Sequence, residues 1–179
     1  MASTRRMTVA VLMLAAAEAR AEGRRDVPYV ATSPAAVQQM IELARLRAGD
    51  VVYDLGCGDG RIVIAAVRVP DVRGVCVEID PGLVRLAREE AEKAGVSSRI
   101  TFVQGDIFEA PIQDATVVML YLLREVNLRL RPRLWRELRA GTRVVSNTFD
   151  MGDWEPERQV SVPPGSTTIY SWTISGARR

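Results

Sequence analysis

The stretch VVYDLGCGDGRIV, from Val51 to Val63, constrains the fold of this chain more than any other feature. An apolar run ends in an aspartate, and glycines then occupy alternate positions at Gly56, Gly58 and Gly60. Glycine adopts backbone conformations that other residues avoid, and it lets a ligand approach the main chain. A second apolar run, RIVIAAVRV, follows directly. The pattern predicts a buried strand, a tight ligand-binding turn and a helix.

Strands and helices alternate along the rest of the chain. We expect strands in the runs VVYDLG, RGVCVEI, RITFVQGD, ATVVMLYLL and TRVVSNTF. We expect helices that begin at Pro34, Arg61 and Pro81, and a further helix from Asn127 to Leu138. Two runs, RQVSV and TTIYSWTI, close the chain with alternating polar and apolar residues. This order predicts a Rossmann-like α/β fold: a seven-stranded, mostly parallel sheet with an antiparallel edge strand and helices on both faces.

Histidine is absent, and the two cysteines, Cys57 and Cys76, lie far apart in the chain. Without histidine, Ser-His-Asp and Cys-His catalysis and histidine-based zinc sites are excluded. The cysteine spacing matches neither a metal site nor a disulfide framework. We therefore expect two small, buried thiols and no bound metal.

The charges are unevenly distributed. The 179-residue chain has 24 basic and 22 acidic residues, and residues 1–26 hold five of the basic and three of the acidic ones. The remainder has 19 of each and is neutral. A neutral domain without a basic block argues against nucleic acid as a partner. The length suits one domain, which we assign to residues 27–179.

The first 26 residues have a different character. Two arginines precede an apolar run from Met7 to Ala17, and small residues follow. This is the layout of a secretory signal, and the run is shorter than the roughly 20 residues that span a bilayer. We expect residues 1–26 to be a signal peptide or a membrane-anchoring segment.

The glycine turn differs from a dinucleotide-binding loop, because that loop would place its third glycine where Arg61 stands. DLGCGDG instead resembles motif I of S-adenosylmethionine-dependent methyltransferases, whose seven-stranded sheet has the element order described above. Their cofactor carries an ammonium group and no phosphate. Asp54 or Asp59 could offset that positive charge, directly or through water.

The ends of the next two predicted strands carry acidic residues that complete this pattern. Glu78 follows the glycine turn at the spacing of an acid that bonds ribose hydroxyls. The resemblance to methyltransferases implies that Asp106 faces the adenine amino group and that Ile107 packs on the ring. It thus implies S-adenosyl-L-methionine as cofactor and S-adenosyl-L-homocysteine as product. The cofactor-binding residues expected from it are Tyr29, Asp54, Gly56, Cys57, Gly58, Asp59, Gly60, Glu78, Ile79, Asp106 and Ile107.

A closer resemblance rests on the combination of PYVATS, DLGCGDGRIVIAA, YLL, GTRVVSNTF and MGDW, from Pro28 to Trp154. These motifs are similar to those of the protein-lysine methyltransferase family that includes the adenine nucleotide translocase and ATP synthase c-subunit enzymes and prokaryotic relatives. The chain departs from that family at PYVATS and at Asn147, where a histidine is frequent. The resemblance implies methyl transfer to a lysine of a protein, with membrane proteins among the candidate substrates.

The acceptor amine should lie where strands four and five end. A lysine ammonium, with an ordinary pKa of about 10.4, must lose a proton before it reacts. The catalytic residues expected at this edge are Thr32, Tyr121, Asn147 and Asp150, with Ser33 and Trp154 as further candidates.

Two alternatives stay open on the sequence. One is a methyltransferase with a small-molecule acceptor. The other is an exported, non-catalytic binding domain on a methyltransferase fold, because a signal-like N-terminus favours export or membrane attachment. The cytoplasmic supply of the cofactor favours the inner face of a membrane instead.

Overall fold

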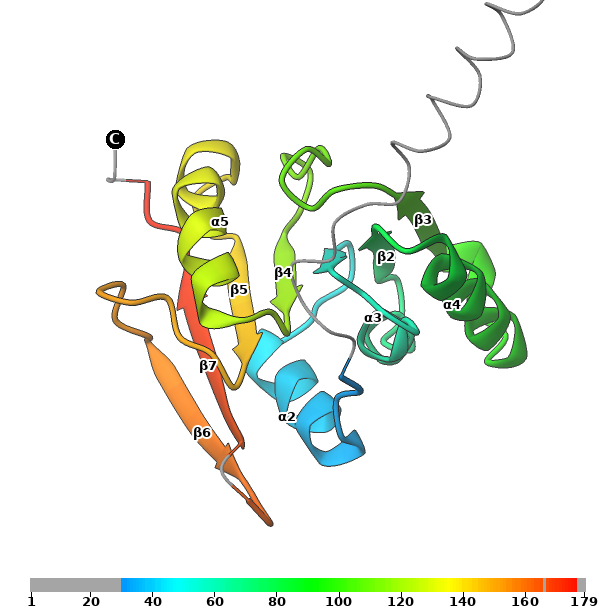
Figure 1. The fold of residues 1–179 in the computed structure, drawn as a ribbon, viewed down its shortest axis with the longest axis horizontal. Helices are drawn as coiled ribbons and strands as arrows, with labels where there is room; N and C mark the ends of the chain where they lie inside the picture. The colour runs from blue at the N-terminus through cyan, green and yellow to red at the C-terminus, as the bar shows by residue number, and fades with distance from the viewer. Residues whose placement is uncertain (1–29, 166, 177–179) are drawn as a thin grey trace, which may run out of the picture.

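The computed structural model describes residues 30–165 and 167–176 of the chain. These residues form a seven-stranded sheet in the order β3-β2-β1-β4-β5-β7-β6. The first five strands run parallel, while β7 pairs antiparallel with both β5 and β6. Figure 1 shows this arrangement, with β6 at the outer edge of the sheet. The expected fold class is confirmed, and the antiparallel strand lies one place inside the sheet edge.

The strands and helices follow the predicted runs closely. The strands are β1 (Val51–Leu55), β2 (Arg73–Glu78), β3 (Ile100–Gln104), β4 (Val117–Leu120), β5 (Arg143–Asn147), β6 (Arg158–Val162) and β7 (Thr167–Thr173). The helices are α2 (Pro34–Ala44), α3 (Arg61–Ala66), α4 (Pro81–Lys93) and α5 (Arg124–Glu137), with a 3₁₀ turn, η1 (Ser97–Arg99).

Local signals explain where the helices begin. Ser33 caps α2 by accepting a hydrogen bond from the N–H of Ala36, and Asp80 caps α4 in the same way from Gly82. A proline follows each cap at the first helical position, where its missing N–H costs nothing. Helix α5 starts at Arg124, one turn earlier than expected, because no capping residue marks its beginning.

Helices cover both faces of the sheet. On one face, α2, α3 and α4 pack over β1 to β7 in a core that includes Met40, Val63, Ala87 and Ile169. On the other face, α5 and the chain after β3 enclose a second core that includes Leu120, Leu130 and Trp172. The sheet is therefore buried on both sides, which accounts for the continuous apolar runs of its inner strands.

The prediction of two free thiols was wrong. Cys57 and Cys76 form a disulfide whose Cα atoms lie 5.4 Å apart, within the usual range. Both residues are buried, as expected. Strands β1 and β2 are neighbours in the sheet. The turn after β1 therefore places Cys57 beside Cys76, which lies within β2. Spacing along the chain could not reveal this contact.

None of the helices within residues 30–165 and 167–176 combines the length and the hydropathy needed to cross a membrane. Residues 1–26, predicted as a signal or anchor, lie outside the described residues.

Candidate active site

The glycine turn connects β1 to α3 in a backbone conformation that only glycine adopts easily. Gly56, Gly58 and Gly60 have φ angles of +79°, +56° and +78°. The N–H groups of Gly56 and Cys57 both donate to the carbonyl of Val77 in β2, at 2.8 and 3.1 Å. A Cβ atom at Gly56 would lie 2.9 Å from Cδ2 of Leu122, so this side chain would have to move to admit one. The backbone angles therefore confirm the conformational reason for glycine inferred from the sequence.

Glu78, the last residue of β2, ties the turn to its neighbouring strand. One carboxylate oxygen, Oε2, accepts a hydrogen bond from Gly58 N at 3.0 Å. The other, Oε1, accepts from the N–H groups of Ile79 and Asp80 at 2.9 and 3.0 Å. Since a carboxylate oxygen can accept two hydrogen bonds, Oε2 retains capacity for a further donor such as a hydroxyl group.

Asp54 lies beneath the turn and is 1% exposed. Its Oδ2 accepts a long hydrogen bond of 3.3 Å from the N–H of Val63. The pKa of the carboxyl group is raised to about 7, chiefly by burial and also by the nearby charges of Glu78 and Asp59, against the hydrogen bond from Val63, which lowers it. A buried carboxylate of this kind is stabilised by a cation, and an ammonium group of the cofactor would supply one.

Asp59 is held differently. Its carboxylate pairs with the guanidinium of Arg61 at 2.6 Å, and Nη1 of Arg61 also donates to the carbonyl of Thr32 at 2.7 Å. Arg61 thus joins the glycine turn to the segment before α2. Of the two acids expected to offset an ammonium, Asp54 is therefore the better placed.

Asp106 and Ile107 follow β3 at the same end of the sheet. Oδ1 of Asp106 accepts from the N–H of Phe108 at 2.8 Å, which fixes the start of this turn. Asp106, Ile107 and Ile79 are all half-buried, as residues that line a ligand site commonly are. Tyr29, the remaining expected cofactor residue, lies outside the described residues.

Strand register places the acceptor candidates beside the glycine turn. Leu55 in β1 is the partner of Leu120 in β4, which in turn is the partner of Ser146 in β5. The next residues along these strands are Gly56, Tyr121 and Asn147. They therefore form a row across the carboxyl edge of the sheet, where ligands bind in folds of this kind.

Tyr121 stacks on Phe149, which the sequence reasoning did not single out. Their ring centroids lie 6.5 Å apart with an interplanar angle of 26°. Between Asn147 and Phe149, Thr148 has a φ of +68°. A β-branched residue in this conformation is strained, and such strain is found mostly at functional sites.

The sequence reasoning also did not identify Asn127 of α5 as a site residue. Its position among the buried residues Val126, Leu130 and Leu134 of this helix was the available signal. It is fully buried, and its Nδ2 lies 3.2 Å from Ser146 Oγ and 3.2 and 3.3 Å from the carbonyls of Phe149 and Asp150. Its Oδ1 has no hydrogen-bond partner within the part of the chain that the structure describes. Asn127 thus holds the loop after β5 in place.

The remaining candidates divide into two groups. Asp150 lies at the surface, where its Oδ1 accepts from Arg124 at 3.0 Å and from Gly152 N at 2.8 Å. Trp154 is instead a core residue, 7% exposed and packed between Trp135 and Trp172. Asp150 is thus a partly exposed carboxylate paired with Arg124, whereas Trp154 is part of an aromatic cluster in the core.

The donor set fits S-adenosylmethionine. The buried carboxylate of Asp54 can pair with the ammonium group of the cofactor. Glu78 retains an acceptor site for a ribose hydroxyl, and the glycine turn leaves its main chain accessible to the ligand. In residues 30–165 and 167–176, no three acidic or cysteine side chains are placed to hold a metal ion.

Known proteins are similar to this chain in sequence and in fold. The family model described as the ANTKMT methyltransferase domain matches residues 54–158. A protein-lysine N-methyltransferase of Saccharolobus islandicus is 44% identical, over 83% of this chain and 94% of its own. The adenine nucleotide translocase lysine N-methyltransferase of Mus musculus is 34% identical, over 95% of this chain and 73% of its own.

Solved structures agree. An RNA methyltransferase from Salinibacter ruber, in complex with S-adenosyl-L-homocysteine, is 52% identical, with a TM-score of 0.80 over 84% of this chain and 97% of that one. A methyltransferase from Geobacter sulfurreducens with the same ligand is 25% identical, with a TM-score of 0.58 over 74% of this chain and 52% of that one. The chain therefore belongs to the ANTKMT methyltransferase family and is an S-adenosylmethionine-dependent methyltransferase.

Proposed function

We propose that this enzyme methylates the ε-amine of lysine residues in a protein substrate. The observation that carries the proposal is the stacked aromatic pair of Tyr121 and Phe149. Tyr121 lies beside the glycine turn, because Leu120 pairs with Leu55 and the next residues are Tyr121 and Gly56. Aromatic faces hold alkylammonium groups by cation–π attraction. Two relatives over 30% identical are named lysine N-methyltransferases, which supports the same acceptor.

The reaction is an in-line displacement. When bound, S-adenosylmethionine supplies a methyl group on an activated sulfonium. The lone pair of the lysine nitrogen forms the new N–CH₃ bond while the S–CH₃ bond breaks and its electron pair stays on sulfur. The protein has to hold a neutral amine in line with the methyl group. We assign that role to Tyr121, Asn147 and Thr32.

The amine must lose its proton before the transfer, because the ammonium form has no lone pair. Asp150 is exposed beside the aromatic pair and can attract the incoming lysine ammonium. The proton then leaves to solvent, with the phenol oxygen of Tyr121 or the carboxylate of Asp150 as an intermediate acceptor. We assign the cofactor to Asp54, Glu78 and Asp106, with the glycine turn between them.

The experiment supplies the full-length protein with tritiated S-adenosylmethionine and, in separate reactions, poly-L-lysine, poly-L-arginine and a mixed-sequence RNA. We expect label in poly-L-lysine alone. Phe149→Ala should lower this labelling at least tenfold with little change in cofactor affinity. Phe102→Ala removes an equally half-buried ring from β3 and should have little effect on labelling.

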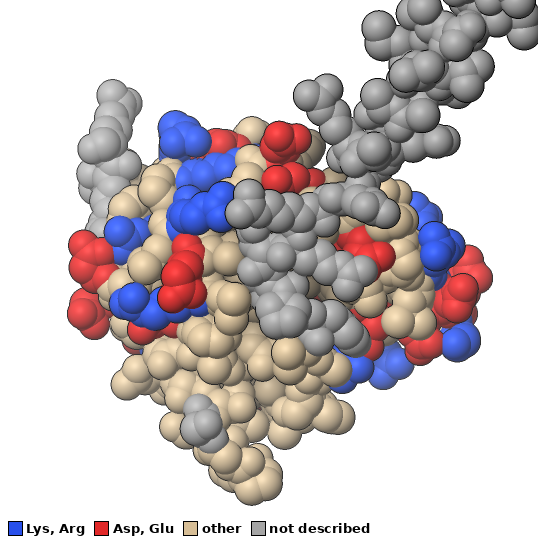
Figure 2. All heavy atoms as spheres, viewed as in Figure 1, with Lys and Arg blue, Asp and Glu red and all other residues tan. Residues whose placement is uncertain are grey.

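The RNA reaction addresses a specific competitor, because the solved relative from Salinibacter ruber is titled an RNA methyltransferase. The neutral composition of residues 27–179 disfavours that acceptor. Figure 2 likewise shows acidic and basic side chains interspersed on the face in view. Labelling of RNA without labelling of poly-L-lysine would refute the protein-lysine proposal.

We also propose that residues 1–26 attach the enzyme to the inner face of a membrane and that its substrate is a membrane protein. The support is the apolar run beside arginines together with the relative named for the adenine nucleotide translocase. Cell fractionation and protease treatment of spheroplasts test this proposal. Protection in intact spheroplasts and recovery with membranes are expected, whereas digestion from outside would contradict the cytoplasmic-face assignment.

A further inference from the structure

A cavity lies at the opposite edge of the sheet from the candidate active site. It encloses about 560 Å³, within the usual range for small-molecule sites. Its walls come from the C-terminal end of α2 and the loop after it, the residues before β4 and β5, the start of β6 and the end of β7. Because β1, β4 and β5 are parallel, this is the amino edge of the sheet.

The cavity is strongly basic. Five arginines line it against two acidic residues: Arg45, Arg47, Arg139, Arg143 and Arg158 against Asp50 and Glu157. The chain beyond residue 26 is neutral as a whole, so this concentration of arginine is a local feature.

One arginine and one acid neutralise each other at the base of the cavity. The guanidinium of Arg143 pairs with Asp50 and donates to the carbonyls of Ala44 and Arg45 at 2.7 and 2.6 Å. Asp50 also accepts from Thr116 Oγ1 at 2.7 Å and from Arg47 N at 2.6 Å. Its charge is thus balanced by Arg143, and this hydrogen-bonded pair forms the floor of the cavity.

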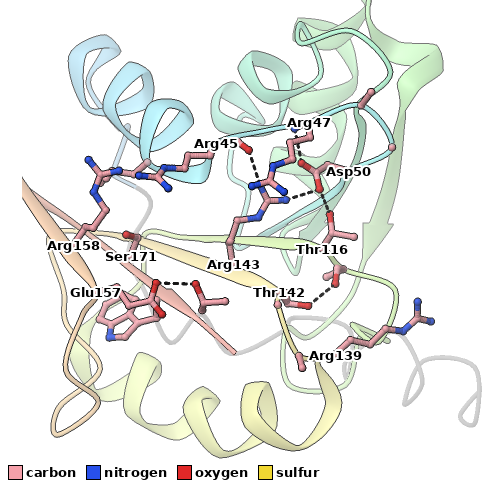
Figure 3. Close-up of a pocket in the computed structure, with 18 residues that line it drawn as sticks. Arg45, Arg47, Asp50, Thr116, Arg139, Thr142, Arg143, Glu157, Arg158 and Ser171 are labelled. Carbon is pink, nitrogen blue, oxygen red and sulfur yellow. Dashed lines mark hydrogen bonds and ion pairs between the residues drawn. The ribbon is translucent and has the colours of Figure 1, made fainter. Parts of the chain in front are cut away.

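Three other arginines have no such partner. Arg45, Arg47 and Arg158 are exposed, and within the described residues no carboxylate forms an ion pair with any of them. Figure 3 shows the side chains of Arg45 and Arg158 extending toward each other at one end of the cavity. Like charges that face each other repel, and an anion between them would remove that repulsion.

A buried hydroxyl adds a neutral donor to this end. Ser171 of β7 is the cross-strand partner of Arg158, lines the cavity and is only 7% exposed. Arginine forks combined with a hydroxyl donor are the groups that recognise phosphate.

We propose that this cavity binds a phosphate-bearing ligand between Arg45 and Arg158, at a site separate from methyl transfer. Phosphate chemistry can come from a free polyphosphate or nucleotide, or from a lipid headgroup at the membrane surface. In either case the ligand is an anion, because the arginines that line the cavity outnumber its acidic residues.

The test titrates the full-length protein with pyrophosphate, with ATP, and with vesicles of phosphatidylglycerol or phosphatidylcholine. The variant is Arg45→Gln/Arg158→Gln, and the matched control is Arg88→Gln/Arg99→Gln, which removes two arginines near β3. We expect micromolar binding of pyrophosphate, ATP or phosphatidylglycerol that weakens at least tenfold in the variant and not in the control. Binding of S-adenosylhomocysteine should be unchanged in both variants.

The pattern of ligands identifies the source of the phosphate. Binding of pyrophosphate or ATP indicates a free metabolite. Binding of phosphatidylglycerol vesicles that weakens in the variant but not in the control indicates a lipid headgroup, because vesicle binding through residues 1–26 would be the same in both. Equal binding by the variant and the control, or no binding below millimolar concentration, would overturn the proposal. These readouts do not involve a methyl acceptor, so they stand apart from the lysine assignment.

Discussion

Oε2 of Glu78 accepts a hydrogen bond from the N–H of Gly58 at 3.0 Å, which joins the end of β2 to the middle of the glycine turn. Glu78 therefore has a structural role in addition to the ribose contact proposed for it. Its carboxylate shapes the turn before any cofactor arrives. The two roles can be separated because the turn needs an acceptor oxygen, while the ribose contact benefits from a full negative charge.

Glu78→Gln and Glu78→Ala should therefore behave differently. The alanine variant leaves one buried N–H group, that of Gly58, and two half-buried ones without an acceptor and should lose about 1–3 kcal/mol of unfolding free energy. The glutamine variant keeps an acceptor oxygen and should be more stable than the alanine variant. Both should bind S-adenosylhomocysteine at least tenfold more weakly by calorimetry. Glu89→Gln, on the exposed face of α4, is the control, and unchanged affinity in both variants would remove Glu78 from the cofactor site.

The raised pKa of Asp54, about 7 against an ordinary 3.8, predicts a pH-dependent affinity. The cofactor ammonium favours the ionised carboxylate, so binding below pH 7 must release a proton. The affinity for S-adenosylmethionine should fall as the pH is lowered from about 7, approaching tenfold per unit. Calorimetry in buffers of different ionisation enthalpy measures that proton release. Asp54→Asn should abolish this pH dependence, and persistence of the full effect would assign it to another group.

The same group should also make the stability of the cofactor-free protein depend on pH. Its pKa is raised in the folded state, so the folded form binds the proton more tightly than the unfolded chain does. This contribution is present at low pH and is lost as the pH rises from about 4 toward 7. Comparison of the unfolding free energies of wild type and Asp54→Asn at pH 5 and pH 8 isolates it. The wild type should lose unfolding free energy relative to Asp54→Asn between pH 5 and pH 8. The same difference between the two proteins at both pH values would contradict the assignment.

The disulfide between Cys57 and Cys76 closes a loop across a sequence separation of 19 residues. A loop of this size is expected to contribute about 3 kcal/mol to stability by restricting the unfolded chain. Cys57→Ala/Cys76→Ala should therefore have a lower midpoint in urea, and reduction of the wild type should reproduce most of that change. Identical midpoints for oxidised and reduced protein would show that the bond contributes nothing. Because Cys57 belongs to the glycine turn, we also expect weaker cofactor binding on reduction.

Asn127 should control the loop that carries Phe149 and Asp150. Asn127→Ala removes the amide donor from the half-buried carbonyls of Phe149 and Asp150 and should cost about 1–3 kcal/mol of stability. It should also reduce kcat, with a smaller effect on the affinity for S-adenosylmethionine. Ser146→Ala removes one partner of this amide and the hydroxyl that donates to the carbonyl of Phe149 at 2.7 Å. It should have a milder effect on both quantities, because Asn127 still donates to both carbonyls. Equal kcat in Asn127→Ala and wild type at a temperature where both are folded would show that the loop does not need this support.

The sequence by itself determined the order of the elements and placed the predicted cofactor residues at one edge of the sheet. The glycine turn, Glu78 and Asp106 could be placed there because each lies at or just after the end of a strand, and parallel strands bring their carboxyl ends to one edge. Local signals also located two helix starts, at Ser33 and Asp80. These features depend on neighbours in the chain, which a sequence displays.

The acceptor half depended on contacts between distant residues. Tyr121 was predicted from its position after β4, but its partner Phe149 and the support from Asn127 exist only because α5 packs against the end of β5. The disulfide and the arginine cavity have the same origin, since each joins residues from neighbouring strands or from opposite ends of the domain. Spacing along the chain carries no information on such contacts, whereas the order of strands in the sheet decides them.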